Sequence, residues 1–183
     1  MPELIARWQD WDAQVLEYLV LQENEDVVRA YSIAIGEADG EPFLAEYFVE
    51  CNREWRTRSV ELGLLPYGRA VAVSSDGAGN WRDGAEKLPA LNGAIDVDIT
   101  CTPFTNTLPI RRLGLEAGQS ADIVVAYIDV PSLTVTADPQ RYTCLEPMRR
   151  YRFESQGGDF VRDIEVDERG LVVLYPGLFK RVL

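Results

Sequence analysis

Hydrophobic and polar positions alternate with a period of two in short segments along most of the chain. The segments are rich in valine, isoleucine, threonine and aromatic residues, and turn residues separate them. This pattern predicts an all-β, mainly antiparallel protein. The expected strands are Val15–Leu21, Val27–Ile35, Phe43–Cys51, Thr57–Leu62, Ala70–Ser74, Ile95–Cys101, Ile123–Val130, Leu133–Thr136, Tyr151–Ser155, Phe160–Val166 and Leu171–Tyr175.

The breaks between these segments carry turn chemistry. The stretches "EADGEP", "SSDGAG", "SQGGD" and "DERG" supply glycine and aspartate where a tight turn needs a positive φ, so hairpins are the expected connections. The first segment, Met1–Asp12, fits a helix and a strand equally well, and both interpretations stay open.

Two places in the chain could hold a helix. In "TNTLPIRRLG", Asn106 or Thr107 can cap the helix, a proline is tolerated in its first turn, and Gly114 can end it. A helix within Thr105–Leu113 is therefore the preferred prediction. The alternative is "DPQRYTCLE", with Asp138 as the N-cap.

Two portions of the chain look alike, "CNREWRTRSVEL…RAVAVSSDGAGNW" and "CLEPMRRYRFES…FVRDIEVDERGLVV". Each runs through a cysteine, a strand with aromatic residues and arginine, an alternating strand, and a turn with aspartate. Duplication of a strand-hairpin unit would produce this likeness, and generic β-patterning would produce it too.

Two aspartates are the first candidates for chemistry. In the strand Ile95–Cys101, Asp96 and Asp98 share one face, with Cβ atoms roughly 7 Å apart, a separation that paired catalytic carboxylates could have. We favour a structural role, in which they are solvated or neutralise Arg111 and Arg112, because spacing locates no other part of an acid–base site. The two arginines could instead bind an anion.

Composition narrows the function classes. The 183 residues, 46% of them hydrophobic, predict one domain spanning residues 1–183. A net charge of −12 makes nucleic acid an unfavourable partner. The chain has no histidine, which excludes a Ser-His or Cys-His nucleophile within it. Three widely spaced cysteines predict free thiols rather than disulfides.

Further motifs are missing. No phosphate-binding loop occurs, and the loop "DGAGNWRDG" has Ala78 where a calcium loop needs an oxygen ligand, so neither a cofactor nor a metal is expected. No apolar run reaches the roughly 18 residues of a spanning helix, and no export signal is visible, so a cytoplasmic location is expected.

Five stretches, "DGAGNWRDG", "GAIDVDITCTPFTNTLPIRRLGL", "QRYTCL", "YRFES" and "GLVVLYPGLFKR", are present in this order. They resemble the bacterial family labelled putative glycolipid-binding proteins, from about Val15 to the C-terminus. The resemblance implies a spiral β-roll or half-open barrel, in which one long sheet wraps around a single short helix. It also implies a homodimer and a fold similar to bacterial lipoprotein carriers, and the glycolipid label rests on that analogy of fold.

The expected function is non-catalytic binding of a glycolipid or another amphipathic, lipid-like ligand. The alternatives are a histidine-free enzyme with Asp96 and Asp98 as acid and base, and a purely structural dimerisation module. No catalytic or metal-binding residue is assigned. The candidate ligand-binding residues are Asp96, Asp98, Asn106, Arg111, Arg112, Trp81 and Tyr142.

Overall fold

The computed structural model describes residues 3–38, 40–66 and 68–182, and in these residues fifteen strands form one sheet. The strands are β1 (Glu3–Asp10), β2 (Leu16–Glu23), β3 (Val27–Ala38), β4 (Glu41–Asn52), β5 (Thr57–Leu64), β6 (Arg69–Ser75), β7 (Trp81–Asp83), β8 (Glu86–Lys87), β9 (Asp96–Ile99), β10 (Ser120–Ile128), β11 (Val135–Glu146), β12 (Arg150–Ser155), β13 (Val161–Val166), β14 (Val172–Tyr175) and β15 (Phe179–Arg181). The helical elements are η1 (Pro89–Leu91), η2 (Phe104–Asn106) and α1 (Thr107–Leu113). No helix in the described ranges is long and apolar enough to cross a membrane.

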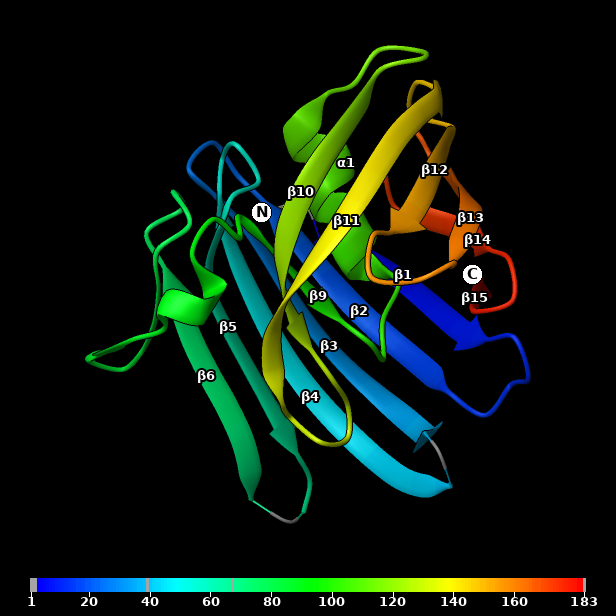
Figure 1. Cartoon of the computed structure of the whole chain (residues 1–183). Helices are drawn as coiled ribbons and strands as arrows, with labels where there is room; N and C mark the ends of the chain where they lie inside the picture. Colours follow the sequence, from blue (N-terminus) through cyan, green and yellow to red (C-terminus); the bar gives the residue numbers. More distant parts are fainter. Residues whose placement is uncertain (1–2, 39, 67, 183) are drawn as a thin grey trace.

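The sheet consists of two arms that start from one seam. The first strand, β1, pairs with the last, β15, and from this seam one arm runs through β2 to β8 and the other through β14 to β9. Neighbouring strands are antiparallel except β9 and β10, which are parallel. The arms curl around α1, and β9 lies inside the curl (Figure 1). The predictions of an all-β fold and of a half-open roll around one short helix are confirmed.

Two hydrophobic clusters fill the roll, and α1 contributes to both. Leu108 packs in the cluster beneath the β1–β6 arm, whereas Ile110 packs in the cluster beneath β11–β15. The two faces of strand β10 meet different surroundings. Ala126 and Ile128 pack in the same cluster as Leu108, whereas Tyr127 lies on the opposite face. The space on the Tyr127 side, between β9–β10 and the second arm, is where the candidate site lies.

The preferred helix prediction is confirmed, because α1 falls within residues 105–113 and Gly114 ends it in the left-handed conformation with a φ of 56°. The capping prediction is confirmed in position only, because Asn106 is the N-cap residue of α1. The turn η2 delivers the chain in a helical conformation, so the Asn106 side chain makes no capping bond. The Thr107 hydroxyl is buried and has no hydrogen-bond partner among the described residues.

The alternative helix at "DPQRYTCLE" is wrong, since these residues belong to β11. The side chains alternate between two faces as in a strand, since one face carries Thr136, Asp138, Gln140 and Tyr142. Pro139 is tolerated because β12 ends opposite the next residue of β11, so the sheet is not continuous on that side.

Strand boundaries differ from the prediction in a few places. In the open N-terminal segment, Glu3–Asp10 form strand β1, and Trp11 and Asp12 lie in the turn that follows. The strand expected at Ile95–Cys101 is shorter, and Leu133 lies in a turn with a φ of 62° rather than in a strand. Strands β7, β8 and β15 were not predicted, because two or three residues are too short to show alternation.

The two similar portions of the sequence share local geometry. In each turn, the carboxylate of Asp76 or Asp167 accepts hydrogen bonds from the backbone N–H groups two and four residues later. In each, the residue four positions after the cysteine, Trp55 or Met148, has a positive φ. The likeness therefore extends from the sequence to the backbone of both turns.

Candidate functional site

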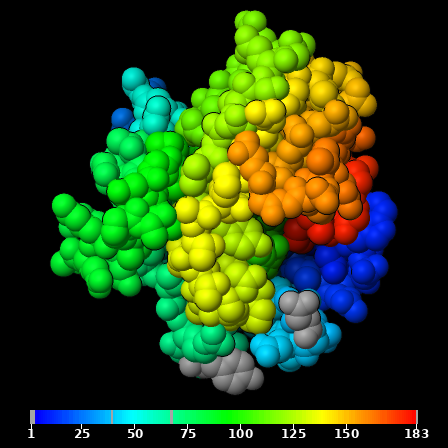
Figure 2. Space-filling model, viewed as in Figure 1, coloured from blue at the N-terminus to red at the C-terminus, as the bar shows by residue number. Residues whose placement is uncertain are grey.

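A partly open cavity of about 550 Å³ lies between the inner strands and the second arm of the sheet. The segments that border it, yellow-green to yellow in β10–β11, orange in β12–β13 and red near β15, gather on one face of the molecule (Figure 2). Its polar lining includes Asp98, Thr102, Asn106, Thr136, Asp138 and Gln140. Its aromatic lining includes Tyr127, Phe153, Phe160, Tyr175 and Phe179.

Strand register brings the polar wall together. Tyr127 on β10 lies opposite both Asp98 on β9 and Thr136 on β11. Gln140, four residues after Thr136 on the same face of β11, lies opposite Ser155 on β12. Since paired residues on neighbouring strands project to the same side, four strands direct polar side chains into one space.

A buried amide links two carboxylates in this wall. The Nε2 atom of Gln140 donates to Asp98 Oδ2 at 2.8 Å and to Asp138 Oδ2 at 3.0 Å. Thr105 donates its hydroxyl to Asp98 Oδ1 at 2.8 Å. Burial raises the pKa of Asp98, and the neighbouring charge of Asp138 adds to the rise, while the bonds from Gln140 and Thr105 oppose it. No arginine or lysine neutralises this pair among the described residues.

The opposite wall is aromatic. The Phe153 ring meets those of Phe160 and Tyr175 edge to face, with centroids 5.9 Å and 6.2 Å apart. Tyr142, which does not line the cavity, packs against Phe153 with the ring centroids 5.5 Å apart. Burial raises the pKa of Tyr175, so its ring presents a neutral phenol to the cavity. Such a wall offers apolar faces and edges for stacking.

The floor of the cavity meets another carboxylate, the buried Glu17 on β2. Its Oε1 atom accepts hydrogen bonds from the hydroxyls of Ser32, Tyr47 and Thr102, and Thr102 also lines the cavity. Its Oε2 atom has no partner among the described residues. Burial raises the pKa of Glu17 to about 7, and the three hydroxyls oppose the rise.

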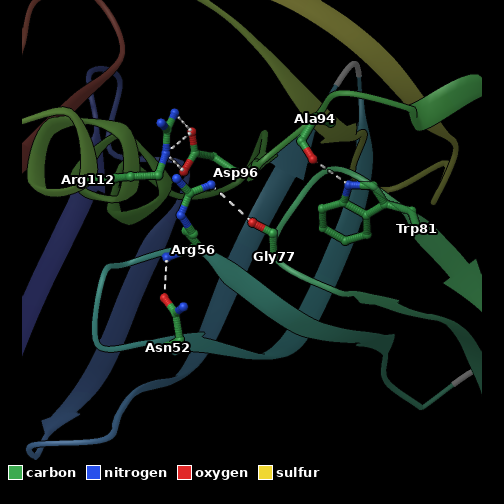
Figure 3. A network of polar contacts seen from close by, with 7 residues as sticks. All are labelled: Asn52, Arg56, Gly77, Trp81, Ala94, Asp96 and Arg112. Carbon is green, nitrogen blue, oxygen red and sulfur yellow. Dashed lines mark hydrogen bonds and ion pairs between the residues drawn. The ribbon is translucent and has the colours of Figure 1, made fainter.

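Asp96 has a different environment from Asp98. Arg112 on α1 donates from Nε to Asp96 Oδ1 at 2.9 Å and from Nη2 to Oδ2 at 2.6 Å, and Asp96 is fully buried (Figure 3). Burial raises the pKa of Asp96, and the Arg112 guanidinium opposes that rise. This ion pair connects α1 to β9, and neither of its residues lines the cavity. Asp96 and Asp98 therefore do not face one ligand space together.

Other candidate residues have structural contacts. Arg111 stacks on the Trp55 ring, with Cζ 4.4 Å from its centroid, and donates to the Arg169 carbonyl at 2.9 Å. Trp81 is 1% exposed and donates its indole N–H to the Ala94 carbonyl (Figure 3). Neither side chain lines the cavity.

Asn106 and Tyr142 lie at the cavity. Asn106 lines it, and its Oδ1 atom accepts a hydrogen bond of 2.8 Å from the Tyr142 hydroxyl behind the wall. Of the seven candidates, the structure thus brings Asp98 and Asn106 to the cavity, with Tyr142 supporting Asn106. It places Asp96, Arg111, Arg112 and Trp81 elsewhere.

Sequence reasoning missed Asp138, Gln140 and Glu17. The helical interpretation of "DPQRYTCLE" hid the first two, although polar residues at alternate positions of a strand would have revealed a polar inner face. For Glu17 the signal was a carboxylate at an inward position between Val15 and Leu19.

Comparison with known proteins supplies the context. The family model described as "Putative glycolipid-binding" matches residues 5–181. A crystal structure of a DUF1089 family protein from Pseudomonas aeruginosa is similar, with a TM-score of 0.79 and 38% sequence identity, covering 91% of this chain and 92% of that one. Among curated proteins, none matches the chain significantly.

Proposed function

The chain belongs to the bacterial family described as putative glycolipid-binding, and from this premise we propose that it binds a glycolipid-like, amphipathic ligand in the cavity without converting it. The observation that carries the proposal is the division of the cavity into a polar wall and an aromatic wall. Ligand pockets in proteins are typically about 300–1,000 Å³, and the cavity falls within this range.

The two walls suit the two parts of such a ligand. Asp98, Asp138 and Gln140 present oxygen atoms that accept hydrogen bonds from the hydroxyl groups of a sugar. The rings of Phe153, Phe160 and Tyr175 offer surface to a sugar face or to the start of an acyl chain. The cavity holds a head group and the first part of a chain, and its open side leaves a path for the rest.

A blocking variant tests this proposal. Thr136→Trp places a large ring at the cavity wall, and Ala137→Trp places the same ring on the opposite, exposed face of β11. Native mass spectrometry would then follow binding of octyl β-D-glucoside and of lipids that co-purify from the host. We expect bound mass in wild type and Ala137→Trp and none in Thr136→Trp. Equal binding by all three proteins would place the ligand elsewhere and contradict the proposal.

A homodimer is the second part of the proposal. Large apolar side chains are exposed on the outer face of β1–β3, where Leu16 (56% exposed) and Ile35 (53%) lie opposite each other. A two-fold axis lets one such face cover its own copy. We expect Leu16→Lys to yield monomers in light scattering and Val161→Lys, on the other arm, to leave the dimer intact. A wild-type monomer at high concentration would refute the assembly.

A cytoplasmic location completes the proposal. It is supported by the three cysteines, Cys51, Cys101 and Cys144, which are free and buried. Fractionation of the host should recover the protein in the cytosol, and recovery from the periplasm or outside the cell would contradict this location.

A further inference from the structure

The cavity offers many hydrogen-bond acceptors and little positive charge. Asp98 and Asp138 both line it, and none of its described lining residues is a lysine or arginine. The nearby Arg162 is occupied elsewhere, since its guanidinium stacks on the Phe160 ring at 4.5 Å and its Nε donates to the Pro176 carbonyl. The chain as a whole carries a net charge of −12. An anionic head group would therefore meet repulsion both in the cavity and on approach.

Gln140 narrows further the kind of head group that the cavity can bind. It is 1% exposed, and its Nε2 atom is committed to the two carboxylates. Its Oε1 atom accepts no hydrogen bond from the described residues and is not among the fully buried atoms without a partner, so it is open to the cavity that Gln140 lines. The cavity thus presents two carboxylates and one amide oxygen as acceptors, and its described lining contains no cation that would compensate the carboxylates.

We propose that the head group of the ligand carries a protonated amine, as in an amino sugar, which Asp98, Asp138 and the Gln140 carbonyl oxygen bind together. This inference rests on the proposed function and adds the chemical class of the head group. An ammonium group has three N–H donors and no acceptor, which matches three acceptors in one wall. Its charge also compensates the two carboxylates, and the aromatic wall favours a cation further.

Four octyl glycosides test the inference, because they differ at one group of the same sugar. They are octyl β-D-glucoside, its 2-amino-2-deoxy analogue, the N-acetylated form of that amine, and octyl glucuronide. Calorimetric titration of the full chain below the micelle concentration gives each affinity. We expect the amine to bind at least about tenfold more tightly than the glucoside, as one charge-assisted hydrogen bond allows. N-acetylation should remove this advantage, and the glucuronide should bind most weakly.

Variants connect the preference to the residues. Asp98→Asn and Asp138→Asn should each lower the ratio of amine affinity to glucoside affinity to near one, whereas Asp83→Asn, at an exposed carboxylate of β7, should leave this ratio unchanged. Asp138 is only half-buried, so its variant remains informative if Asp98→Asn does not fold. Equal affinity for amine and glucoside would overturn the inference and leave the proposed function standing. Absence of binding by every glycoside would overturn both.

Discussion

Asp96 and Asp98 lie two residues apart on the same face of β9, yet their surroundings differ. Asp96 is fully buried and accepts three hydrogen bonds from Arg112 of the helix, the shortest at 2.6 Å. Asp98 has no cation beside it among the described residues, accepts hydrogen bonds from Thr105 and Gln140, and lines the cavity. The elements packed across from the strand set this difference, with α1 above one carboxylate and β11 beside the other.

The comparison separates a carboxylate that holds the fold together from one that is available to a ligand. A buried ion pair is costly to break from one side, because the remaining charge is left without a partner. A carboxylate at a cavity keeps unused lone pairs, which a ligand can satisfy by supplying donors. Mutations at the two positions should therefore affect different measurements.

The largest expected effect is the loss of Arg112. Arg112→Met leaves Asp96 buried without its partner, and we expect the free energy of unfolding to fall by roughly 3–5 kcal/mol. Arg152→Met removes one partner of the exposed Arg152–Asp163 pair and should cost under about 1 kcal/mol. Urea unfolding measures both. A similar small loss in the two variants would show that the Asp96–Arg112 pair does not stabilise the fold.

A third carboxylate, Glu17, should make the free energy of unfolding depend on pH. Its pKa rises from 4.5 to about 7 on folding, so its contribution to stability is complete below pH 4.5 and is lost as the pH rises through 7. Relative to wild type, Glu17→Gln should gain about 3 kcal/mol in unfolding free energy between pH 4.5 and about pH 8. Urea unfolding at several pH values checks this, with exposed Glu61→Gln as the control. A constant difference across the range would mean that Glu17 is ionised throughout.

Apart from the Arg152→Met control, the smallest expected effect concerns Arg111, the neighbour of Arg112. Its side chain is 26% exposed and stacks on Trp55, and its ion pair with Glu23 is long, at 3.5 Å. Arg111→Met keeps the apolar stem and should cost about 1 kcal/mol, the size of a partly exposed cation–π contact. Urea unfolding of this variant beside Arg112→Met completes the series. Equal losses of unfolding free energy in the two variants would show that the adjacent arginines contribute equally to stability, which would contradict the comparison.

The fold was largely predictable because one face of most strands is buried, and burial leaves a period-two pattern in the sequence. The inner strands are different. In β9 both Asp96 and Val97 are buried although they project to opposite faces, so alternation cannot say which face meets the core. The helix was predictable because Gly114 and the apolar residues around it are local signals.

The candidate site was much less predictable, because it depends on contacts between distant parts of the chain. Asp98 and Gln140 are 42 positions apart, and only the parallel pairing of β9 with β10 and the hairpin to β11 bring them together. Sequence reasoning could place Asp96 and Asp98 on one face. It could not show that Arg112 would neutralise Asp96 and leave Asp98 to the cavity.

The increase in unfolding free energy caused by a ligand tests the central claim most directly. With octyl 2-amino-2-deoxy-β-D-glucoside at 100 times its Kd, wild type should gain about 2.7 kcal/mol. Asp96→Asn should be less stable than wild type and keep this gain. Asp98→Asn should lose about 1.4 kcal/mol of the gain, which corresponds to a tenfold weaker Kd. A full gain in Asp98→Asn, together with a reduced gain in Asp96→Asn, would contradict the account.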